Sequence, residues 1–459
     1  MMDHDLIVVG GGAAGLGAVR AALWAGADVA LITDSPPGGE CTFTGCVPSK
    51  TLLAAARDGL SFAEAMARVR STVAHIAATE SAEVLQNGGA TVIEGRARLT
   101  THDTVAVGDR RITAPRIVLA TGSRPALPDD IPGLAEAQPL TNETVFDLAA
   151  APESLGIIGG GTTGCELAQA LAILGVEVTL FEQGPQLLPS EDSEAAALVS
   201  EALGQLGVAM RLDTRVEAVE PAPGGGIAVR ASCRDGAADG APAVCERLLA
   251  ATGRVPMTEG LGLTEMKVKL DPQGHVITND RMVTSLRGVF AAGDVTGRAF
   301  MSHAADEMGR IATGNALGKG LRGRFRVSTV PRVVFTDPEL ASVGVTPADA
   351  PAGSRVAFLP LAEVDRAITD GRTDGFIAIV AGPRRLLRNT GGGRILGATI
   401  VAPRAGEMIQ EIVLAMRTGA FAGRLAQASH AYPTWSNGVQ KTAAQFFGEV
   451  EGRQASRVD

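Results

Sequence analysis

The sequence predicts an α/β fold made of two similar parallel-sheet domains followed by a C-terminal α+β domain. A strand, a glycine-rich turn, a helix and a second strand occur in this order at the N-terminus, and the same order recurs from Leu155. From Val327 onward, the apolar stretches FIAIVAG and RILGATIVA flank the helical segment AGEMIQEIVLAMRTG, which is typical of an antiparallel sheet with helices. The length of 459 residues also fits roughly three domains of about 150 residues each.

The composition narrows the class of protein. The chain is 46% apolar and 20% charged, and its 57 glycines suit packed α/β layers with tight turns. The net charge of −9 argues against nucleic-acid binding. The N-terminus is acidic, no apolar run is long enough to span a membrane, and five cysteines are too few for a secreted disulfide scaffold. We therefore expect a cytoplasmic protein that binds neither nucleic acid nor membrane.

The first glycine-rich turn follows the apolar strand DLIVVG. Gly10, Gly12 and Gly15 have the GxGxxG spacing, which lets a pyrophosphate approach the N-terminus of the following helix. Asp34 ends the next strand, 19 residues beyond Gly15, where an acid would accept a ribose hydroxyl. The order of strand, turn, helix and acid favours a dinucleotide site over a mere tight turn.

The second glycine-rich turn contains Gly159, Gly161 and Gly164, and Glu182 follows eighteen residues after the last of these. Two such turns imply two cofactors, or one cofactor and one substrate nucleotide. A carboxylate at Glu182 would accept the 2′-hydroxyl of NADH and repel the 2′-phosphate of NADPH. The sequence therefore favours NADH, with NADPH as the less favoured cofactor.

The segment GGECTFTGCVPSK holds two cysteines, Cys41 and Cys46. Five helical steps cover about 7.5 Å, whereas a disulfide prefers Cα atoms about 4.4–6.8 Å apart. A bond therefore requires a distorted turn, which Gly45 allows. Cys46 lies near a predicted helix N-terminus with Lys50 four residues later, an arrangement that favours a thiolate. The spacing alone leaves a redox-active pair and two inert buried cysteines equally open.

Taken together, the sequence resembles the pyridine nucleotide–disulfide oxidoreductases, the flavoproteins that include dihydrolipoamide dehydrogenase, glutathione reductase and mercuric reductase. The likeness covers essentially the whole chain. It is carried by the two glycine turns, GGECTFTGCVPSK, GGGTTGCELA, two ATG strands, AAGDVTG and PRVVFTDPELASVG. The GGxCxxxGCxPSK form is specific to this family and favours the redox-active pair. The resemblance implies a glutathione reductase-like fold, with an FAD-binding domain at 1–148 and 264–326, an NAD(H)-binding domain at 149–263 and a dimerisation domain at 327–459.

The resemblance also implies which residues hold FAD and NADH. Asp294 would contact the flavin ribityl chain, and Thr33 is an alternative to Asp34 as the residue nearest the ribose. The cofactor-binding residues are expected in the glycine turns, the ATG strands and the acids that follow strands: Gly10, Gly12, Gly15, Asp34, Lys50, Thr121, Gly122, Gly159, Gly161, Gly164, Glu182, Gly253 and Asp294.

The catalytic roles are carried over from the family in the same way. Cys46 would be the charge-transfer thiolate next to the flavin, and Cys41 the interchange thiol that meets the substrate. Lys50 and Glu166 would form an ion pair near the flavin N5, with an ordinary salt bridge as the alternative. Hydride would pass from NADH to FAD, and electrons from FAD to the cysteine pair.

The C-terminal stretch SHAYPTWSNG departs from dihydrolipoamide dehydrogenase and glutathione reductase. Tyr432 stands where those enzymes carry an acid–base histidine, and Asn437 stands where a glutamate orients it. A phenol with a pKa near 10 is a poor base at neutral pH. His430 would replace the histidine only if the loop were shifted. For Tyr432, substrate contact and packing at a subunit interface are equally open.

An aromatic residue at Tyr432 resembles mercuric reductase, although the sequence carries neither that enzyme's C-terminal cysteine pair nor its N-terminal metal-binding domain. We expect an NADH-dependent FAD oxidoreductase with a non-dithiol acceptor, which would be a metal ion such as Hg(II), a quinone or an unusual disulfide. The alternatives are a dihydrolipoamide dehydrogenase with an altered acid–base residue and a flavin-binding protein with a degenerate site. We expect a homodimer, because the family's C-terminal loop completes the neighbour's active site.

Overall fold

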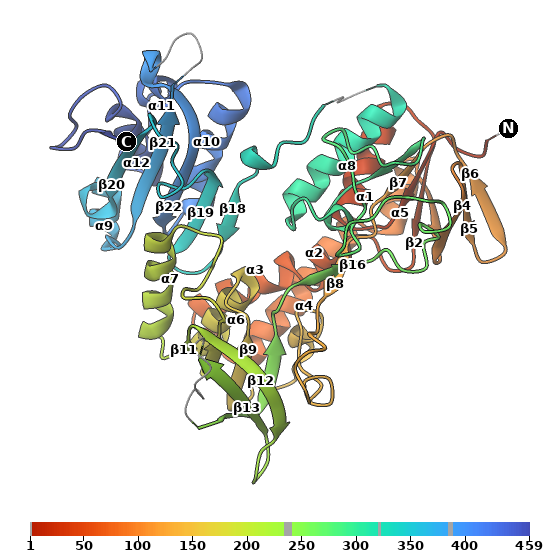
Figure 1. Cartoon of the computed structure of the whole chain (residues 1–459), viewed down its shortest axis with the longest axis horizontal. Helices are drawn as coiled ribbons and strands as arrows, with labels where there is room; N and C mark the ends of the chain where they lie inside the picture. Colours follow the sequence, from red (N-terminus) through yellow and green to blue (C-terminus); the bar gives the residue numbers. More distant parts are fainter. Residues whose placement is uncertain (1, 234–240, 320–322, 384–388) are drawn as a thin grey trace. The chain divides into compact units, whose positions relative to one another are not determined.

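The computed structural model describes residues 2–233, 241–319, 323–383 and 389–459, and the chain forms two compact units. Figure 1 shows the chain with most of its helices and many of its strands labelled. The predicted α/β class is confirmed, whereas the boundaries of three domains stay a prediction. Unit 1 consists of Met1–Pro128, Leu140–Ala150 and Thr252–Val327, and unit 2 of Asp129–Pro139, Ala151–Ala251 and Ser328–Asp459.

Unit 1 is built on a five-stranded parallel sheet with the strand order β17–β7–β1–β2–β3. Every residue of β1, β2, β7 and β17 is buried, as expected for parallel strands that are covered on both faces. The strands are β1 (Leu6–Val9), β2 (Val29–Thr33), β3 (Thr91–Glu94), β7 (Ile117–Leu119) and β17 (Val289–Ala291).

Two helices of unit 1, α1 (Ala13–Trp24) and α8 (Ser302–Leu317), pack closely side by side (Figure 1). A Cβ atom added at Gly309 would lie 2.0 Å from the carbonyl oxygen of Ala14, so glycine is needed for this approach. The other elements of the unit are α2 (Gly39–Phe43), α3 (Cys46–Arg57), α4 (Phe62–Thr79), α5 (Ala82–Asn87), β4 (Ala97–Thr101), β5 (Thr104–Val107), β6 (Arg110–Thr113), β8 (Ser123–Pro125), η1 (Val145–Asp147), β16 (Arg254–Pro256) and η2 (Asp294–Thr296).

Unit 2 repeats the strand–turn–helix pattern in a four-stranded parallel sheet with the order β11–β10–β9–β15. A three-stranded antiparallel sheet, β12–β13–β14, accompanies it. The elements are β9 (Ser154–Ile158), α6 (Thr162–Ile173), β10 (Glu177–Phe181), α7 (Ser193–Gln205), β11 (Ala209–Arg211), β12 (Thr214–Pro221), β13 (Ile227–Cys233), β14 (Ala243–Cys245) and β15 (Arg247–Ala250).

The C-terminal part of unit 2 contains a six-stranded sheet with the order β18–β19–β22–β21–β20–β23. All its strand pairs are antiparallel, which confirms the predicted change of architecture. Its elements are η3 (Val327–Thr329), β18 (Arg332–Val334), β19 (Glu339–Gly344), β20 (Arg355–Pro360), η4 (Leu361–Glu363), α9 (Asp365–Asp370), β21 (Phe376–Gly382), η5 (Thr390–Gly392), β22 (Arg394–Ala402), α10 (Ala405–Thr418), α11 (Ala422–Gln427), α12 (Trp435–Ala444) and β23 (Ser456–Arg457).

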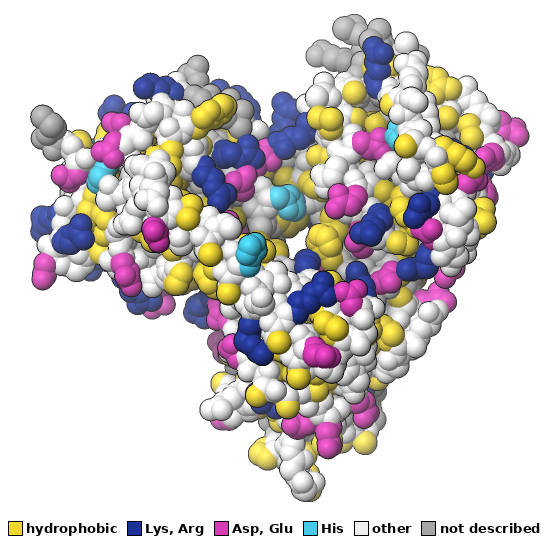
Figure 2. Space-filling model, turned by 180° about the vertical axis from the view of Figure 1, so that it is seen from behind, with side chains coloured by type: hydrophobic (Ala, Val, Ile, Leu, Met, Phe, Trp, Pro, Cys, Tyr) yellow, Lys and Arg dark blue, Asp and Glu magenta, His cyan; other side chains and the backbone are white. Residues whose placement is uncertain are grey.

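Two further features concern the apolar character of the helices and the distribution of charge on the surface. Within the described ranges, no helix combines the length and the apolar character needed to cross a bilayer. On the face drawn in Figure 2, basic and acidic side chains are interspersed.

Candidate functional site

The two glycine turns have the same backbone geometry. Gly10 has a φ of +106° and Gly159 a φ of +109°, values that residues with a side chain rarely adopt. A Cβ atom at Gly15 would lie 1.8 Å from the carbonyl oxygen of Gly10, and one at Gly164 would lie 2.0 Å from that of Gly159. The first and third glycines of each turn are therefore required by the local fold.

The middle glycines differ, because they leave open space. Gly12 and Gly161 have ordinary φ values of −77° and −75° and cap the N-termini of α1 and α6 without a side-chain hydrogen bond. A Cβ atom at Gly161 would meet nothing within 4 Å, and one at Gly12 would meet only the Cα atom of Gly39, at 4.0 Å. A helix N-terminus with open space before it fits the pyrophosphate of a dinucleotide. Both turns thus fit the cofactors that the sequence predicts.

The acid of the second turn lies at the end of β10. The Glu182 carboxylate is buried and accepts hydrogen bonds from the backbone N–H groups of Gly160, at 2.7 Å, and Gly184, at 2.8 Å. A carboxylate has about four acceptor positions, so it can still accept a ribose hydroxyl. The role of Glu182 toward a ribose hydroxyl stays a prediction.

The residue of unit 1 that corresponds to Glu182 is Thr33. In both units it directly follows the strand residue whose carbonyl accepts the N–H of the first glycine, at 2.8 Å. Thr33 also follows Gly15 by eighteen residues, the spacing of Gly164 and Glu182. The Asp34 side chain is 48% exposed and lies 3.5 Å from the Arg96 guanidinium. The register favours the alternative, Thr33, and the role of Asp34 stays a prediction.

The two cysteines lie on either side of a helix break. Cys41 is inside α2, Cys46 is the first residue of α3, and Gly45 separates the helices. A Cβ atom at Gly45 would lie 3.0 Å from the carbonyl oxygen of Glu40 and 3.3 Å from the Cα atom of Cys41. The break therefore depends on glycine, and Cys46 has the predicted place at a helix N-terminus.

Neither Cys41 nor Cys46 forms a disulfide in this structure, both are partly exposed, and Ser302 lies beside them. The Cys46 Sγ is 3.4 Å from the Ser302 Oγ. The pKa of Cys41 is raised, because Cys41 hydrogen-bonds to Cys46, is largely removed from water and faces the charge that Cys46 acquires, while Ser302 opposes the shift. Cys46 begins α3, where a helix N-terminus favours a thiolate, and its charge-transfer role stays a prediction.

Replacing Ser302 with alanine is expected to raise the pKa of the Cys46 thiol, which we take as the reactive one. A hydroxyl that donates to a thiolate stabilises the charged form, and its loss corresponds to about one pH unit. The measurement is the rate of iodoacetamide alkylation of the reduced protein as a function of pH. Ser302→Thr, which keeps the hydroxyl, should retain the original profile. An unchanged profile in Ser302→Ala would rule out this hydrogen bond as a control on the thiol.

The remaining predicted cofactor-binding residues of unit 1 lie after strands or at the start of a short helix. Thr121 and Gly122 follow β7, and the Thr121 hydroxyl donates to the carbonyl of Met257 at 2.7 Å. Gly122 and Gly253 both have positive φ values, +72° and +130°, and a Cβ atom at either would meet nothing within 4 Å. Asp294 begins η2, and burial raises the pKa of its carboxyl. Their cofactor-binding roles, including the flavin contact of Asp294, stay predictions.

The predicted ion pair joins residues of different units. Lys50 lies in α3 of unit 1, four residues after Cys46. Glu166 lies in α6 of unit 2, is 2% exposed, and accepts the backbone N–H of Phe335 at 3.0 Å. The pairing of Lys50 with Glu166 stays a prediction.

The C-terminal loop places Tyr432 and His430 differently. Tyr432 is 71% exposed, and the hydrogen bond and charge of Asp365 raise the pKa of its phenol. His430 Nδ1 lies 2.9 Å from the carbonyl oxygen of Ala428, and its Nε2 lies 2.9 Å from Glu411 Oε2. Because a carbonyl only accepts, Nδ1 carries a proton, and Nε2 is occupied by the carboxyl. In this conformation His430 has no nitrogen free to act as a base.

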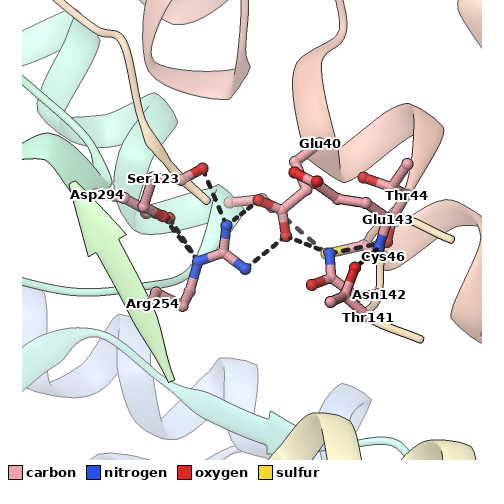
Figure 3. A network of polar contacts seen from close by, with 10 residues as sticks. Glu40, Thr44, Cys46, Ser123, Thr141, Asn142, Glu143, Arg254 and Asp294 are labelled. Carbon is pink, nitrogen blue, oxygen red and sulfur yellow. Dashed lines mark hydrogen bonds and ion pairs between the residues drawn. The ribbon is translucent and has the colours of Figure 1, made fainter. Parts of the chain in front are cut away.

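Sequence reasoning missed four polar residues around the cysteine segment, which are drawn in Figure 3: Glu40, Ser123, Asn142 and Arg254. They come from α2, β8, the segment before η1 and β16, so no local spacing links them. In the described part of the chain, no group of three or more His, Cys, Asp or Glu residues is arranged to hold a metal ion.

A dinucleotide turn in each unit and a thiol pair at a helix N-terminus define a nucleotide-dependent thiol oxidoreductase. Residues 4–310 match the family described as pyridine nucleotide-disulphide oxidoreductase, and residues 330–443 match the dimerisation domain of that family. The chain belongs to this family. The resemblance predicted from the sequence is confirmed, and so is its class as an FAD-dependent oxidoreductase.

Individual relatives match nearly the whole chain. The chain is 33% identical to a dihydrolipoyl dehydrogenase from Thermus scotoductus over 96% of this chain and 97% of the relative. It is 32% identical to a mercuric reductase from Bacillus cereus over 98% of this chain and 72% of the relative. Among solved structures, the Cu(II) complex of the HOCl-induced flavoprotein disulfide reductase RclA from Escherichia coli has a TM-score of 0.85 at 27% identity and covers 97% of this chain and 99% of that one.

Proposed function

We propose that the protein passes electrons from NADH through FAD to the Cys41/Cys46 pair, and from there to an acceptor that needs no histidine base. The observation that carries this proposal is the C-terminal loop. Tyr432 occupies the acid–base position with a raised phenol pKa, and His430 has both ring nitrogens engaged. A metal ion is the favoured acceptor, since relatives are named mercuric reductase and RclA was solved with Cu(II).

The residues of unit 1 would handle the electrons as follows. FAD, when bound, accepts hydride from the nicotinamide and supplies an electron pair to the disulfide. The S–S bond then breaks, two electrons and one proton are taken up, and one thiol, Cys41, and one thiolate, Cys46, form. Cys46 at the N-terminus of α3 holds the thiolate, and Cys41 meets the acceptor. Reduction of Hg(II) to Hg(0) consumes the two electrons, releases the proton of the Cys41 thiol to water and restores the disulfide.

The finer points of cofactor and assembly belong to the same proposal. The buried carboxylate of Glu182 supports NADH over NADPH, because it would face the 2′-phosphate of NADPH. The match to the family's dimerisation domain indicates a homodimer, and we place the partner's C-terminal loop at the active site. The low cysteine count supports a cytoplasmic location.

The test is anaerobic titration of the purified yellow protein with NADH, followed by turnover with Hg(II), Cu(II), a quinone, glutathione disulfide and lipoamide. We expect turnover with a metal ion or a quinone but not with lipoamide. A like-charge contact worth at least about 1.4 kcal/mol should make kcat/KM for NADH at least about tenfold higher than for NADPH. Brisk lipoamide turnover would instead establish a dihydrolipoyl dehydrogenase.

Restoring the missing base is expected to create lipoamide activity. The double variant Tyr432→His/Asn437→Glu supplies a histidine and a carboxylate to orient it, and general acid–base catalysis typically contributes about 10²–10⁴-fold. The measurement is kcat/KM for dihydrolipoamide in the variant and the wild type. Tyr432→Phe is the matched control and should show no gain. A folded double variant without gain would contradict the proton-shuttle explanation.

A further inference from the structure

The segment before Cys41 is held by one arginine from a distant part of the chain. Arg254, the first residue of β16, donates from Nη1 to Glu40 Oε1 at 2.7 Å and from Nη2 to Glu40 Oε2 (Figure 3). The side chains of Arg254 and Glu40 are 21% and 30% exposed. A partly buried arginine–carboxylate pair with two parallel hydrogen bonds fixes the orientation of the carboxylate as well as its distance from the guanidinium. Glu40 is therefore held in a single orientation next to Cys41.

The same guanidinium reaches the residue expected to contact FAD. Arg254 Nε donates to Ser123 Oγ at 2.7 Å, and that hydroxyl donates to Asp294 Oδ2 at 2.7 Å. Arg254 Nε also lies 3.6 Å from Asp294 Oδ2, and Nη2 donates to the Ser123 carbonyl at 3.1 Å. One cation thus serves two partly buried carboxylates, Glu40 and Asp294, that would otherwise repel each other. Burial raises the pKa of both carboxyls, and Arg254 opposes both shifts.

The other side of Glu40 reaches the end of the same short helix. Asn142 Nδ2 donates to Glu40 Oε1 at 2.9 Å and lies 3.2 Å from the carbonyl oxygen of Thr44 (Figure 3). Thr44 ends α2 and directly precedes Gly45, where the chain breaks before α3. The polar network therefore holds both ends of the helix that carries Cys41.

We propose that Arg254 and Glu40 are positioning residues that set the geometry of the Cys41 and Cys46 sulfur atoms and thereby the stability of their disulfide. This inference rests on the proposed redox role of the two cysteines. The equilibrium between a dithiol and its disulfide depends on how well the protein holds the two sulfurs together. Releasing one end of α2 lets Cys41 move away, which weakens the disulfide and raises its reduction potential.

The experiment is a redox titration of the FAD-loaded enzyme in dithiothreitol buffers, with thiol trapping and mass spectrometry of the cysteine peptide. The variants are Arg254→Gln, Glu40→Gln and the double substitution. Each single change is expected to lower the equilibrium constant for disulfide formation about tenfold, which raises the potential by about 30 mV. The double variant should show no larger shift than either single one, because both changes break the same pair.

The matched control is Arg332→Gln. Arg332 makes a similar two-pronged pair with Glu191, at 2.7 and 3.2 Å, in unit 2. Losing this pair should change the equilibrium constant for disulfide formation by less than about twofold, which shifts the reduction potential of the cysteines by less than about 10 mV. A shift as large as that of Arg254→Gln would mean a general loss of stability and would overturn the proposal.

The remaining outcomes separate this inference from the proposed function. If Arg254→Gln fails to fold, Glu40→Gln decides, because it retains the Ser123–Asp294 contacts. If the wild type titrates normally and neither single variant shifts the reduction potential, the positioning role is overturned and the proposed function stands. If the shifts of the two single variants add up in the double variant, Arg254 and Glu40 do not act as one pair, and the proposal is overturned. If the wild type forms no Cys41–Cys46 disulfide, both the inference and the proposed function fall.

Discussion

Replacing Cys46 with alanine is expected to lower turnover by roughly 10³-fold or more while leaving the protein folded and flavin-bound, because the variant lacks one partner of the redox pair. Long-wavelength absorption of the NADH-reduced enzyme should disappear as well, since it requires a thiolate next to the flavin. Cys46 begins α3 and its Sγ lies 3.4 Å from the Ser302 Oγ, two features that favour a thiolate. The measurements are steady-state turnover and anaerobic absorption spectra.

Cys41→Ala is the matched control for this prediction. It should lose turnover to the same extent but keep the long-wavelength band, because Cys46 remains as a free thiolate. The two roles would have to be exchanged if Cys46→Ala kept the band and Cys41→Ala lost it. Loss of the band in both variants, with FAD still bound, would mean that the absorption needs both sulfurs.

An added methyl group is expected to destabilise the protein strongly at Gly164 of the second turn and only slightly at Gly161. In Gly164→Ala the Cβ atom would lie 2.0 Å from the Gly159 carbonyl oxygen, so the backbone must shift at a cost of about 2–3 kcal/mol in the free energy of unfolding. In Gly161→Ala nothing lies within 4 Å, and the cost is about 0.5–1 kcal/mol, that of a poorer helix cap.

Nucleotide binding completes the comparison. Gly161→Ala fills the space before α6, so the Kd for NADH should rise at least about tenfold although the fold is retained. The measurements are urea unfolding and anaerobic NADH binding for both variants. Gly12→Ala provides the parallel test in unit 1, where FAD retention should fall instead. Unchanged NADH binding in a stable Gly161→Ala protein would contradict the placement of the pyrophosphate at this turn.

Local spacing predicted the parts of the site that lie close together in the sequence. The three glycines of each turn and the cysteine segment are each coded within a few residues, and the structure gives them the expected turns and helix starts. The count from Gly15 to the acid pointed to Asp34, whereas the strand register points to Thr33. The second turn already indicated Thr33, because Glu182 follows the third glycine of that turn by eighteen residues, and the same count from Gly15 leads to Thr33.

The residues that sequence reasoning missed come from remote segments. Arg254 and Glu40 are 214 residues apart, and Ser302 and Cys46 are 256 apart. Only the packing of α2, β8, β16 and α8 into unit 1 brings such residues together, and no local pattern encodes that packing. The pair between His430 and Glu411 was missed for the same reason, since Glu411 belongs to a helix that precedes the C-terminal loop.

The three-segment origin of unit 1 has a consequence for biosynthesis. The edge strand β17 of its sheet and the helix α8 that packs against α1 both belong to the segment that begins at Thr252. Neither can join the unit before that segment has been made. A nascent chain that ends at Ala251 would lack the α8 residues Gly309 and Thr313, which lie against Ala14 and Ala18 of α1 in the finished unit. Such a chain also lacks Arg254, Asp294 and Ser302. Ribosomes add residues one after another over many seconds, so we expect the predicted FAD site of unit 1 to be complete only late in synthesis, after Leu317 has been added.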